Sequence, residues 1–500
     1  MSKIHIIYPD IDTGYYPNIN HGIAFLAGAV RTAGHEFSFD HLTRRESPDD
    51  TARRALATGS NIIGFSMCHN QRKWAKEIIG SLREGKCKAL IIAGGIYPTT
   101  DPEEVFRYLD VDGAAIGESE ITLPKLMNVI DNGATRVDEL SGFYFRRTDG
   151  SIKKNNIPPL EADITKLPLP DYSVFDLGKI VKESGGWMTM LLMRGCPYNC
   201  YYCCNSILMN LYPVKKDYFR VPPVDYAIKL IKQNLGFVDG VRGIVFDDDL
   251  LCLRSDWFLE FARRYVDEIG LPYNINARAE TLTDKVIVAL KESGCRIVNI
   301  GVESGSPEVR ENILNRNYTN ELLISVFSKL NQAGILTSTF NMIGLPFETR
   351  EQMRETLKIN IKLKPYRGAC FYFYPYPGTH LYDICIENNL LKPGYDKLTG
   401  YFKEPAIKMT RCREKDPVNI CERLRLYLYT RRLLSSIGMG YLSNILYYAA
   451  TPFAGVVSRL ITGDSWLKSW VRRFVYRAAV LKREGEDKKL ENCSRGLIFK

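Results

Sequence analysis

The sequence predicts an α/β protein in which a doubly wound parallel sheet of the Rossmann or flavodoxin kind precedes a partial (β/α)6 barrel and a helical C-terminal region. Two stretches of the chain, residues 1–132 and 186–375, alternate short apolar runs with segments of helical period. Such alternation is typical of parallel sheets whose strands are joined by helices. After about residue 400 only the helical patterns continue.

The length and composition indicate a folded protein of several domains. At 500 residues the chain is too long for a single core, and roughly 150 residues per domain suggests about three domains. Hydrophobic residues make up 45% and charged residues 25% of the sequence, which is ordinary for globular proteins. We expect a first domain at residues 1–132, a linker at 133–185, a barrel at 186–400 and a basic helical region at 401–500.

The first domain carries five apolar runs of strand length. The expected strands are Ile4–Tyr8, Glu36–Asp40, Ile62–Ser66, Ala89–Ala93 and Gly113–Ile116, and the clearest helical patterns are Gly22–Thr32 and Lys73–Arg83. In a doubly wound sheet, ligands bind beyond the carboxyl ends of the strands. Those ends carry Gly64-Phe65-Ser66, Gly94-Gly95-Ile96 and Gly117-Glu118-Ser119-Glu120, so we expect a binding site there.

The linker contains one hairpin pattern and a proline-rich stretch. The hairpin covers Gly142–Lys153 and turns at Asp149-Gly150. Pro168 and Pro170 discourage regular structure in the segment that follows.

The barrel region resumes the alternation of strands and helices. Its expected strands are Met188–Met193, Gly243–Phe246, Tyr273–Ala277, Ile297–Gly301, Thr337–Ile343 and Ala369–Tyr374. Its expected helices are Val224–Asn234, Trp257–Ile269, Asp284–Ser293, Asn320–Ala333 and Arg350–Leu363. Six such units predict an open barrel with its chemistry at the carboxyl ends of the strands.

Three of the thirteen cysteines form a motif directly after the first barrel strand, in the segment Arg194-Gly195-Cys196-Pro197-Tyr198-Asn199-Cys200-Tyr201-Tyr202-Cys203. Three thiolates on one loop at this spacing reach three irons of a cubane cluster and leave the fourth iron open to a substrate or cosubstrate. The alternative is a zinc site, which needs a fourth Cys or His ligand. Cys204 adjoins Cys203 and is poorly placed to ligate the same ion, and none of the six histidines lies nearby in the sequence.

The spacing of Cys196, Cys200 and Cys203, with the aromatic Tyr202 before the last cysteine, resembles the CxxxCx(aromatic)C signature of the radical S-adenosylmethionine (radical SAM) superfamily. The resemblance implies that the three cysteines are the catalytic metal ligands and hold a 4Fe-4S cluster, whose open iron chelates the methionyl amine and carboxylate of SAM. Reduction by an external electron donor of the flavodoxin or ferredoxin type then cleaves SAM to a 5′-deoxyadenosyl radical. Tyr202 is expected to lie against the adenine; its alternative role is to pack within the loop.

Other strand ends are also similar to the family's pattern. Asp248 follows the second barrel strand, Arg278 follows the third, and Glu303 and Ser304 end the fourth. Any one of these segments alone could be loop chemistry, but together they strengthen the resemblance, which covers about residues 186–380. It implies that these four residues bind the cofactor, with Glu303 or Ser304 at the ribose or methionyl end of SAM.

The first domain is similar to the cobalamin-binding domain that one branch of this family carries. Ser66-Met67-Cys68, followed by Gly94-Gly95, resembles the S-x-L…GG pattern of that domain. The resemblance implies that Ser66, Gly94 and Gly95 contact cobalamin, and small residues do let a backbone approach a large ring closely. Cys68 stands where the pattern has leucine, and the D-x-H-x-x-G motif, whose histidine ligates cobalt, is absent. A degenerate domain that only packs on the barrel is therefore the alternative.

The reaction depends on whether cobalamin binds. If it does, we expect a cobalamin-dependent C-methyltransferase that methylates an unactivated carbon. If it does not, a radical cyclisation or rearrangement is expected, since sulfur insertion is disfavoured by the lack of a second cysteine triplet in the first domain. A non-catalytic scaffold that only binds a cluster is the third possibility.

The last hundred residues are strongly basic and partly apolar. Residues 401–500 hold 20 Lys and Arg against 9 Asp and Glu, while the first 400 residues sum to about zero. Leu433–Ser458 has no charged residue, and Trp466–Arg477 is basic and aromatic at helical spacing. These features predict helices that pack on the barrel or lie at a membrane interface rather than a true span. We therefore expect a small hydrophobic substrate and peripheral contact with a membrane.

The location and the partners follow from two absences in the sequence. The N-terminal segment Met1–Tyr8 has no signal-peptide pattern, so we expect a cytoplasmic protein, peripheral at the membrane surface. No RNA-binding module is evident and the positive charge is confined to one region, so no nucleic-acid partner is expected.

Overall fold

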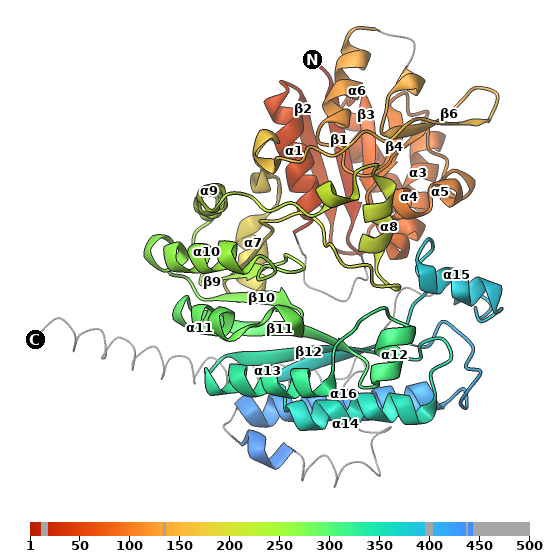
Figure 1. Ribbon diagram of the computed structural model, residues 1–500. Helices are drawn as coiled ribbons and strands as arrows, with labels where there is room; N and C mark the ends of the chain where they lie inside the picture. The colour runs from red at the N-terminus through yellow and green to blue at the C-terminus, as the bar shows by residue number, and fades with distance from the viewer. Residues whose placement is uncertain (12–18, 134–136, 396–403, 437–438, 444–500) are drawn as a thin grey trace, which may run out of the picture. The chain divides into compact units, whose positions relative to one another are not determined.

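The computed structural model describes residues 1–11, 19–133, 137–395, 404–436 and 439–443 (Figure 1). The chain divides into two compact units. Unit 1 comprises Met1–Ala277, Val288–Arg296 and Pro375–Gly400, and unit 2 comprises Arg278–Ile287, Ile297–Tyr374 and Tyr401–Lys500.

Sheet A forms the N-terminal part of unit 1. Its parallel strands are β1 (Lys3–Pro9), β2 (Glu36–Leu42), β3 (Ile62–Ser66), β4 (Leu90–Gly94) and β5 (Gly113–Ala115), in the order β2-β1-β3-β4-β5. This is the flavodoxin type of doubly wound sheet, in which the strand order reverses between β1 and β3. The predicted fold class of the first domain is confirmed.

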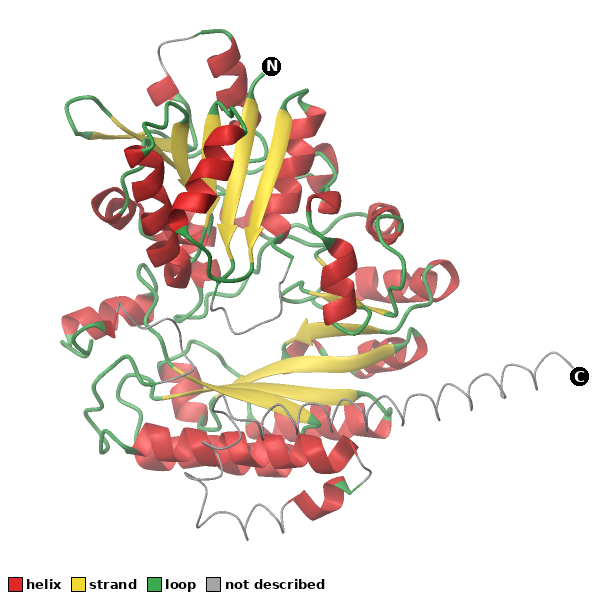
Figure 2. Ribbon diagram, turned by 180° about the vertical axis from the view of Figure 1, so that it is seen from behind, coloured by secondary structure: helices red, strands yellow, loops and turns green. Residues whose placement is uncertain are grey.

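Helices cover both faces of sheet A, and Figure 2 shows them in red beside the yellow strands. On one face α1 (His21–Thr32) contacts α6 (Thr122–Asp131), and elsewhere α2 (Pro48–Ala57) contacts α3 (Arg72–Glu84). The short helices α4 (Ile96–Thr100) and α5 (Pro102–Tyr108) connect β4 to β5. A hydrophobic core that includes Phe65, Ile78 and Ile91 lies between the strands and the second group of helices.

The predicted hairpin is present and extends sheet A. Its strands β6 (Phe143–Arg146) and β7 (Ile152–Lys154) pair antiparallel, and β6 also pairs antiparallel with β5. Gly150 adopts φ +82° in the turn, which suits glycine. The hairpin predicted within the linker is therefore the edge of the first sheet.

Sheet B contains six strands in the order β13-β12-β11-β10-β9-β8. They are β8 (Trp187–Met190), β9 (Gly243–Phe246), β10 (Tyr273–Ala277), β11 (Cys295–Glu303), β12 (Leu336–Ile343) and β13 (Arg367–Tyr372). Strands β8 to β10 pair in parallel, as do β11 to β13. This sequential parallel order is that of an open barrel, as predicted.

The strands of sheet B alternate with helices. These are α7 (Leu177–Glu183), α8 (Cys204–Leu211), α9 (Val224–Leu235), α10 (Ser255–Glu268), α11 (Asp284–Glu292), α12 (Pro307–Asn312), α13 (Asn320–Gln332), α14 (Arg350–Leu363), α15 (His380–Glu387) and α16 (Asp416–Ser436). Single 3-10 turns occur at His69–Gln71, Val137–Glu139, Ile164–Lys166, Tyr172–Val174, Lys215–Tyr218, Ala279–Thr281 and Gly440–Leu442.

Helix α16 is part of the core of unit 2. Cys421, Leu424 and Tyr427 are fully buried, and the Arg425 Nε donates to the carbonyl of Cys370 on β13 at 3.0 Å. The helical pattern predicted after residue 400 therefore begins with a helix that packs on the last barrel strand. Residues 444–500, which include most of the uncharged stretch and all of Trp466–Arg477, lie outside the described residues. Among the described residues, no helix combines the length and the apolar character that crossing a bilayer requires.

Close packing of α1 depends on a glycine. A Cβ on Gly28 would collide with the main chain at Leu169 and Pro170, and the Asp171 N–H donates to the Ala24 carbonyl at 2.8 Å in the same contact. The proline-rich segment after the hairpin therefore lies directly on α1.

We expect Gly28→Ala to lower the stability of the protein by about 1–3 kcal/mol, because the new methyl group meets backbone that must shift. Gly80 in α3 is the matched control, since a Cβ there meets no atom within 4 Å. Gly80→Ala should stabilise the helix by roughly 0.5–1 kcal/mol. Thermal unfolding of the cofactor-free protein measures both changes. A midpoint for Gly28→Ala equal to or above that of Gly80→Ala would contradict the packing.

A buried carboxyl group binds the main chain directly after β12. Glu348 is 0% exposed, and its Oε2 accepts the N–H groups of Gly344 at 2.8 Å and Leu345 at 3.0 Å. Burial raises the pKa of Glu348 to about 8, against the lowering effect of these two donors.

A carboxyl whose pKa is raised by folding stabilises the fold while it is protonated, so this contribution is full below 4.5 and is lost as pH rises through about 8. From about pH 5 to pH 9, the free energy of unfolding of the wild type should fall by about 1–3 kcal/mol more than that of Glu348→Gln. The control Glu103→Gln removes an exposed carboxyl whose pKa is lowered by Lys154. Its stability profile should stay parallel to that of the wild type over this range, and a parallel profile for Glu348→Gln would refute the assignment.

Candidate functional site

The three motif cysteines lie on the loop between β8 and α8 in unit 1. Cys200 is buried and Cys196 and Cys203 are partly exposed. The N–H of Cys203 donates to the carbonyl of Cys200 at 3.1 Å, and Cys203 is the residue that precedes the first turn of α8. Among the described residues, no three His, Cys, Asp or Glu side chains converge on a point that could hold a single metal ion. A cubane cluster does not need such convergence, because each thiolate binds a different iron.

The surroundings of Cys196 and Cys203 favour the thiol form in the cluster-free chain. Burial raises the pKa of Cys196 to about 12, with smaller contributions from Asp249, Cys203 and Cys200. A hydrogen bond with Cys204, followed by burial, raises the pKa of Cys203 as well. Three soft sulfur donors on one loop fit an iron–sulfur cluster, and binding iron would release their protons.

Asp248 supports the start of the cysteine loop. It is 1% exposed, and its carboxylate accepts the N–H groups of Leu192, at 3.0 Å, and Met193. Burial raises its pKa to about 7. These bonds replace strand pairing, which explains why β8 ends at Met190 rather than at Met193 as predicted.

The acidic neighbours of Asp248 have other partners. Asp249 accepts from the Asn205 side chain at 2.9 Å, next to the cysteines. Asp247 lies 3.3 Å from the Nε2 of His21 at the start of α1, and the Nδ1 of His21 lies 2.8 Å from the Tyr172 hydroxyl. The end of β9 therefore contacts both the cysteine loop and the first helix of the chain.

The aromatic residues of the motif differ in their surroundings. The ring of Tyr201 packs on His380, with ring centres 4.2 Å apart, and its carbonyl accepts the N–H of Leu381 at 3.1 Å. The segment after β13 thus holds the cysteine loop from a second side. Tyr202 is partly exposed, and its contact with adenine remains a prediction.

In unit 2 the three predicted cofactor-binding residues each have a separate polar partner. Glu303 has φ +59°, a left-handed conformation that is uncommon outside glycine, and its Oε1 lies 2.7 Å from the Nη1 of Arg316. Arg278 pairs with Glu280 at 2.7 Å. Ser304 is 0% exposed and its hydroxyl lies 3.3 Å from that of Thr356.

The predicted residues of the first domain meet at the ends of β3 and β4. Ser66 and Gly94 are paired neighbours in sheet A, and the side chain of Asn20 donates to the Ser66 hydroxyl at 3.5 Å. Gly95 has φ +95°, and a Cβ there would lie 2.9 Å from the main-chain N and O of Met67. Position 95 therefore requires glycine, whereas a Cβ at Gly94 would make ordinary contacts.

The structure thus groups the predicted residues by unit. Unit 1 holds the cysteine loop with Asp248 and, at the end of sheet A, Ser66, Gly94 and Gly95, whereas unit 2 holds Arg278, Glu303 and Ser304. Sequence reasoning missed the partners Arg194, Arg220 and His21. Ion pairs between residues so distant in the sequence leave no local pattern. The sequence pointed to the two arginines only indirectly, by placing Glu118 and Glu120 directly after a strand.

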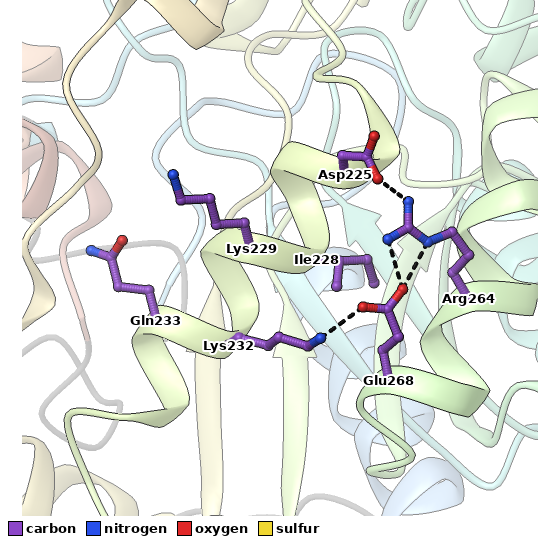
Figure 3. A pocket seen from close by; sticks show the side chains of 7 residues that line it. All are labelled: Asp225, Ile228, Lys229, Lys232, Gln233, Arg264 and Glu268. Carbon is purple, nitrogen blue, oxygen red and sulfur yellow. Dashed lines mark hydrogen bonds and ion pairs between the residues drawn. The ribbon is translucent and has the colours of Figure 1, made fainter.

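A surface hollow between α9 and α10 is lined by none of these residues (Figure 3). There Glu268 accepts from both Arg264 and Lys232 at 2.7 Å, and Arg264 also pairs with Asp225. These exposed charges compensate one another, so the hollow is not assigned to the reaction.

Two family profiles match the chain in separate regions. The profile of the B12 binding domain matches residues 10–127, and the profile of the Radical SAM superfamily matches residues 190–359. The first region holds the Gly95 turn and the second begins at the cysteine loop. A radical SAM domain works with a 4Fe-4S cluster and SAM, and a B12-binding domain holds cobalamin, so the predicted cofactors are confirmed for these two domains.

Relatives with similar sequences cover most of the chain. An uncharacterized methyltransferase of Pyrococcus horikoshii is 26% identical over 372 residues, covering 74% of this chain and 79% of that protein. The anaerobic magnesium-protoporphyrin IX monomethyl ester cyclase of Rubrivivax gelatinosus is 21% identical over 370 residues, covering 72% of this chain. The match spans 65% of that cyclase, a little under two thirds of its length.

Two solved structures share the fold. The cobalamin-dependent S-adenosylmethionine radical enzyme OxsB, solved with aqua-cobalamin and SAM, matches with a TM-score of 0.69 at 15% identity, over 100% of this chain and 82% of OxsB. The radical SAM methyltransferase TsrM of Kitasatospora setae, solved with cobalamin and a [4Fe-4S] cluster, matches with a TM-score of 0.63 at 17% identity, over 78% of each chain. At these identities the likeness concerns the fold.

The strand-end loop with its three thiols, the glycine turn at the end of sheet A, and the order of the two profile matches lead to one assignment. The chain is an enzyme of the radical SAM superfamily in which a B12-binding domain precedes the radical SAM domain.

Proposed function

We propose that this enzyme methylates an unactivated carbon of a small substrate, with a 4Fe-4S cluster on Cys196, Cys200 and Cys203 and cobalamin at the end of sheet A. The observation that carries the proposal is that one compact unit contains both the three-thiol loop and the glycine turn at Gly95. A methyl carrier and a source of radicals would then be held by the same body. Cobalamin supplies a cobalt that can carry a methyl group, and the cluster supplies the electron that cleaves SAM.

The chemistry balances with two molecules of SAM per product. One molecule loses its methyl group and leaves S-adenosylhomocysteine. The other takes one electron, releases methionine and yields the 5′-deoxyadenosyl radical, which removes a hydrogen atom from the substrate and becomes 5′-deoxyadenosine. The methyl group would join the substrate radical. Two electrons are needed per product, one to cleave SAM and one to return the methyl carrier to its starting oxidation state, and both would come from an external flavodoxin or ferredoxin.

The chain's own residues would bind and orient SAM. Tyr202 would lie against the adenine. Glu303 is the better of the two strand-end candidates for the ribose or methionyl group, because Arg316 fixes its carboxylate while the Ser304 hydroxyl is engaged with Thr356. Arg278, held by Glu280, would offer positive charge to the methionyl carboxylate.

Cyclisation or rearrangement with a degenerate first domain is the weaker candidate. It draws on the names of two cyclase relatives, at 21% and 24% identity. Against it stands the match to the B12-binding domain, which cluster binding without catalysis does not explain either.

An apolar surface in unit 2 supports a hydrophobic substrate. Thr339 and Asn341 of β12 bond to Asn360 of α14, so they face the helices. Phe340 lies between them in the strand and points to the opposite face, where it is 37% exposed. The ring of Phe371 on β13 lies 6.4 Å from that of Phe340, at an interplanar angle of 24°. The exposed ring of Phe340, next to the partly exposed ring of Phe371, is suited to an apolar ligand.

The cysteine assignment predicts that anaerobically reconstituted protein carries one four-iron cluster and, after reduction, converts SAM to 5′-deoxyadenosine. Cys200→Ala should lose at least about 100-fold in 5′-deoxyadenosine formation, because the cluster would keep only two protein ligands. Cys252→Ala, which removes another buried thiol, should retain both signals. Iron and sulfide analysis, the electron paramagnetic resonance spectrum and chromatography of SAM products provide the measurements. A tetrahedral zinc ion in place of the cluster would reject the assignment.

The basic C-terminal region should bring the enzyme to anionic lipid, a proposal that rests on sequence alone. Full-length protein is expected to float with anionic liposomes at low salt and to dissociate at high salt, as an electrostatic contact requires. A chain ending at residue 443 keeps α16 on β13 and should not float. Equal flotation of the two chains, or no flotation of either, would count against membrane contact.

A further inference from the structure

The strongest group of buried charges in unit 1 lies at the base of the cysteine loop. Arg194, two residues before the first cysteine, places its Nη2 2.7 Å from the Oε1 of Glu120 and its Nη1 3.5 Å from the Oε2 of Glu118. Arg220 also pairs with Glu118. The side chains of Arg220 and Glu120 are only 3% and 7% exposed. Both glutamates follow β5, so the loop after the last parallel strand of sheet A meets the cysteine loop.

The same two arginines close the cysteine loop through their main chains. The Arg194 N–H donates to the Arg220 carbonyl at 3.0 Å, and the Arg220 N–H donates to the Arg194 carbonyl at 2.9 Å. This antiparallel bridge joins the two ends of residues 194–220, the segment that contains all three cysteines. Contacts that hold Arg194 and Arg220 in place therefore also hold the two ends of the cysteine-bearing segment in place.

Further contacts restrict the movement of the cysteine-bearing segment relative to the loop after β5. The Tyr212 hydroxyl, from within the closed segment, accepts the N–H of Glu118 at 2.8 Å. Gly117 has φ +77°, and a Cβ there would collide with Tyr212. On the other side, the Arg194 guanidinium lies over the ring of Phe25 in α1, 3.6 Å from its centre.

Stability alone is a poor reason to place two buried and two partly buried charges together. Removing charged groups from water is unfavourable, and well-packed apolar residues often stabilise a core as well or better. What a network of ion pairs provides is a unique arrangement, because each guanidinium has a fixed geometry of donors and a shift of the loop would separate a buried charge from its partner.

We propose that the four-charge network of Arg194, Arg220, Glu118 and Glu120 is a positioning device that locks the cysteine loop to the loop after β5. Arg194 and Glu120 act as positioning residues, through the ion pair that they form with each other at the base of the cysteine loop. The lock sets where the SAM bound at the cysteine loop lies with respect to the end of sheet A. This position sets the ratio of methyl donation by SAM to radical formation from SAM. The statement about this ratio rests on the proposed function.

The lock itself is tested by hydrogen exchange in the cofactor-free protein. Glu120→Gln keeps the shape of the side chain and removes its charge, so Arg194 loses its shortest ion pair. Amides within residues 194–220 should exchange at least about 10-fold faster than in the wild type, with the strands of sheet A unchanged. Glu268→Gln is the matched control, because it removes a carboxylate that pairs with two cations at an exposed site. Equal exchange over residues 194–220 in wild type and Glu120→Gln would overturn the lock.

Coupling is tested with SAM as the only probe, in reduced protein loaded with cluster and cobalamin. The ratio of S-adenosylhomocysteine to 5′-deoxyadenosine should fall several-fold in Glu120→Gln, at unchanged iron content and cluster spectrum. A role in folding alone would lower both products together and leave the ratio constant, which would overturn the coupling. Arg194→Lys should resemble Glu120→Gln, because an ammonium group cannot replace the two-sided guanidinium.

The hydrogen-exchange and product-ratio experiments distinguish a failure of this inference from a failure of the proposed function. A wild type that forms no S-adenosylhomocysteine would refute methyl transfer while leaving the exchange result to decide on the lock. If Glu120→Gln does not fold, Glu118→Gln, which affects both arginines at a less buried carboxylate, replaces it with the same expected outcomes.

Discussion

The cluster site depends on a pairing of charges far apart in the sequence. Arg194 and Arg220 join the two ends of the cysteine-bearing segment through main-chain hydrogen bonds, and their side chains reach Glu118 and Glu120 beyond β5. Between β8 and α8 the cysteine loop contains no helix or strand. Its shape is therefore determined by its two ends and by the elements that it contacts. Asp248 adds a second constraint by binding the N–H groups of Leu192 and Met193.

The parallel order of the strands explains why these groups meet. In both sheets the functional residues follow the carboxyl ends of strands, where parallel topology brings successive loops to one edge. In sheet A this edge carries Ser66, the Gly95 turn and Glu118; in unit 1 the ends of β8 and β9 carry the cysteines and Asp247 to Asp249. Burial raises the pKa of Asp248 to about 7 and raises that of Asp249 as well, and the nearby Asp247 adds to both shifts.

Much of this architecture was predictable from local patterns. The alternation of apolar runs located every strand of both sheets to within a few residues, and the spacing of the three cysteines identified the cluster loop. Local patterns failed where a distant partner decides the structure. Strand β8 stops early because the Asp248 carboxylate takes the next amides, and Glu303 adopts a left-handed conformation beside Arg316. The ion network at Arg194 was not predicted, since no periodicity links residue 118 to residue 220. The cofactor-binding roles of Tyr202, Arg278 and Glu303 remain predictions.

If the proposed function is right, one body of the enzyme holds both a radical-generating cluster and a corrin. The visible spectrum of protein purified without oxygen from cells supplied with cobalamin, together with a count of corrin per chain, tests this. We expect close to one corrin per chain with its characteristic visible bands, and loss of most of it when Gly95 is replaced by valine, whose side chain would occupy the turn against Met67. Corrin-free wild-type protein, which nevertheless cleaves SAM at full rate after cluster reconstitution, would contradict it.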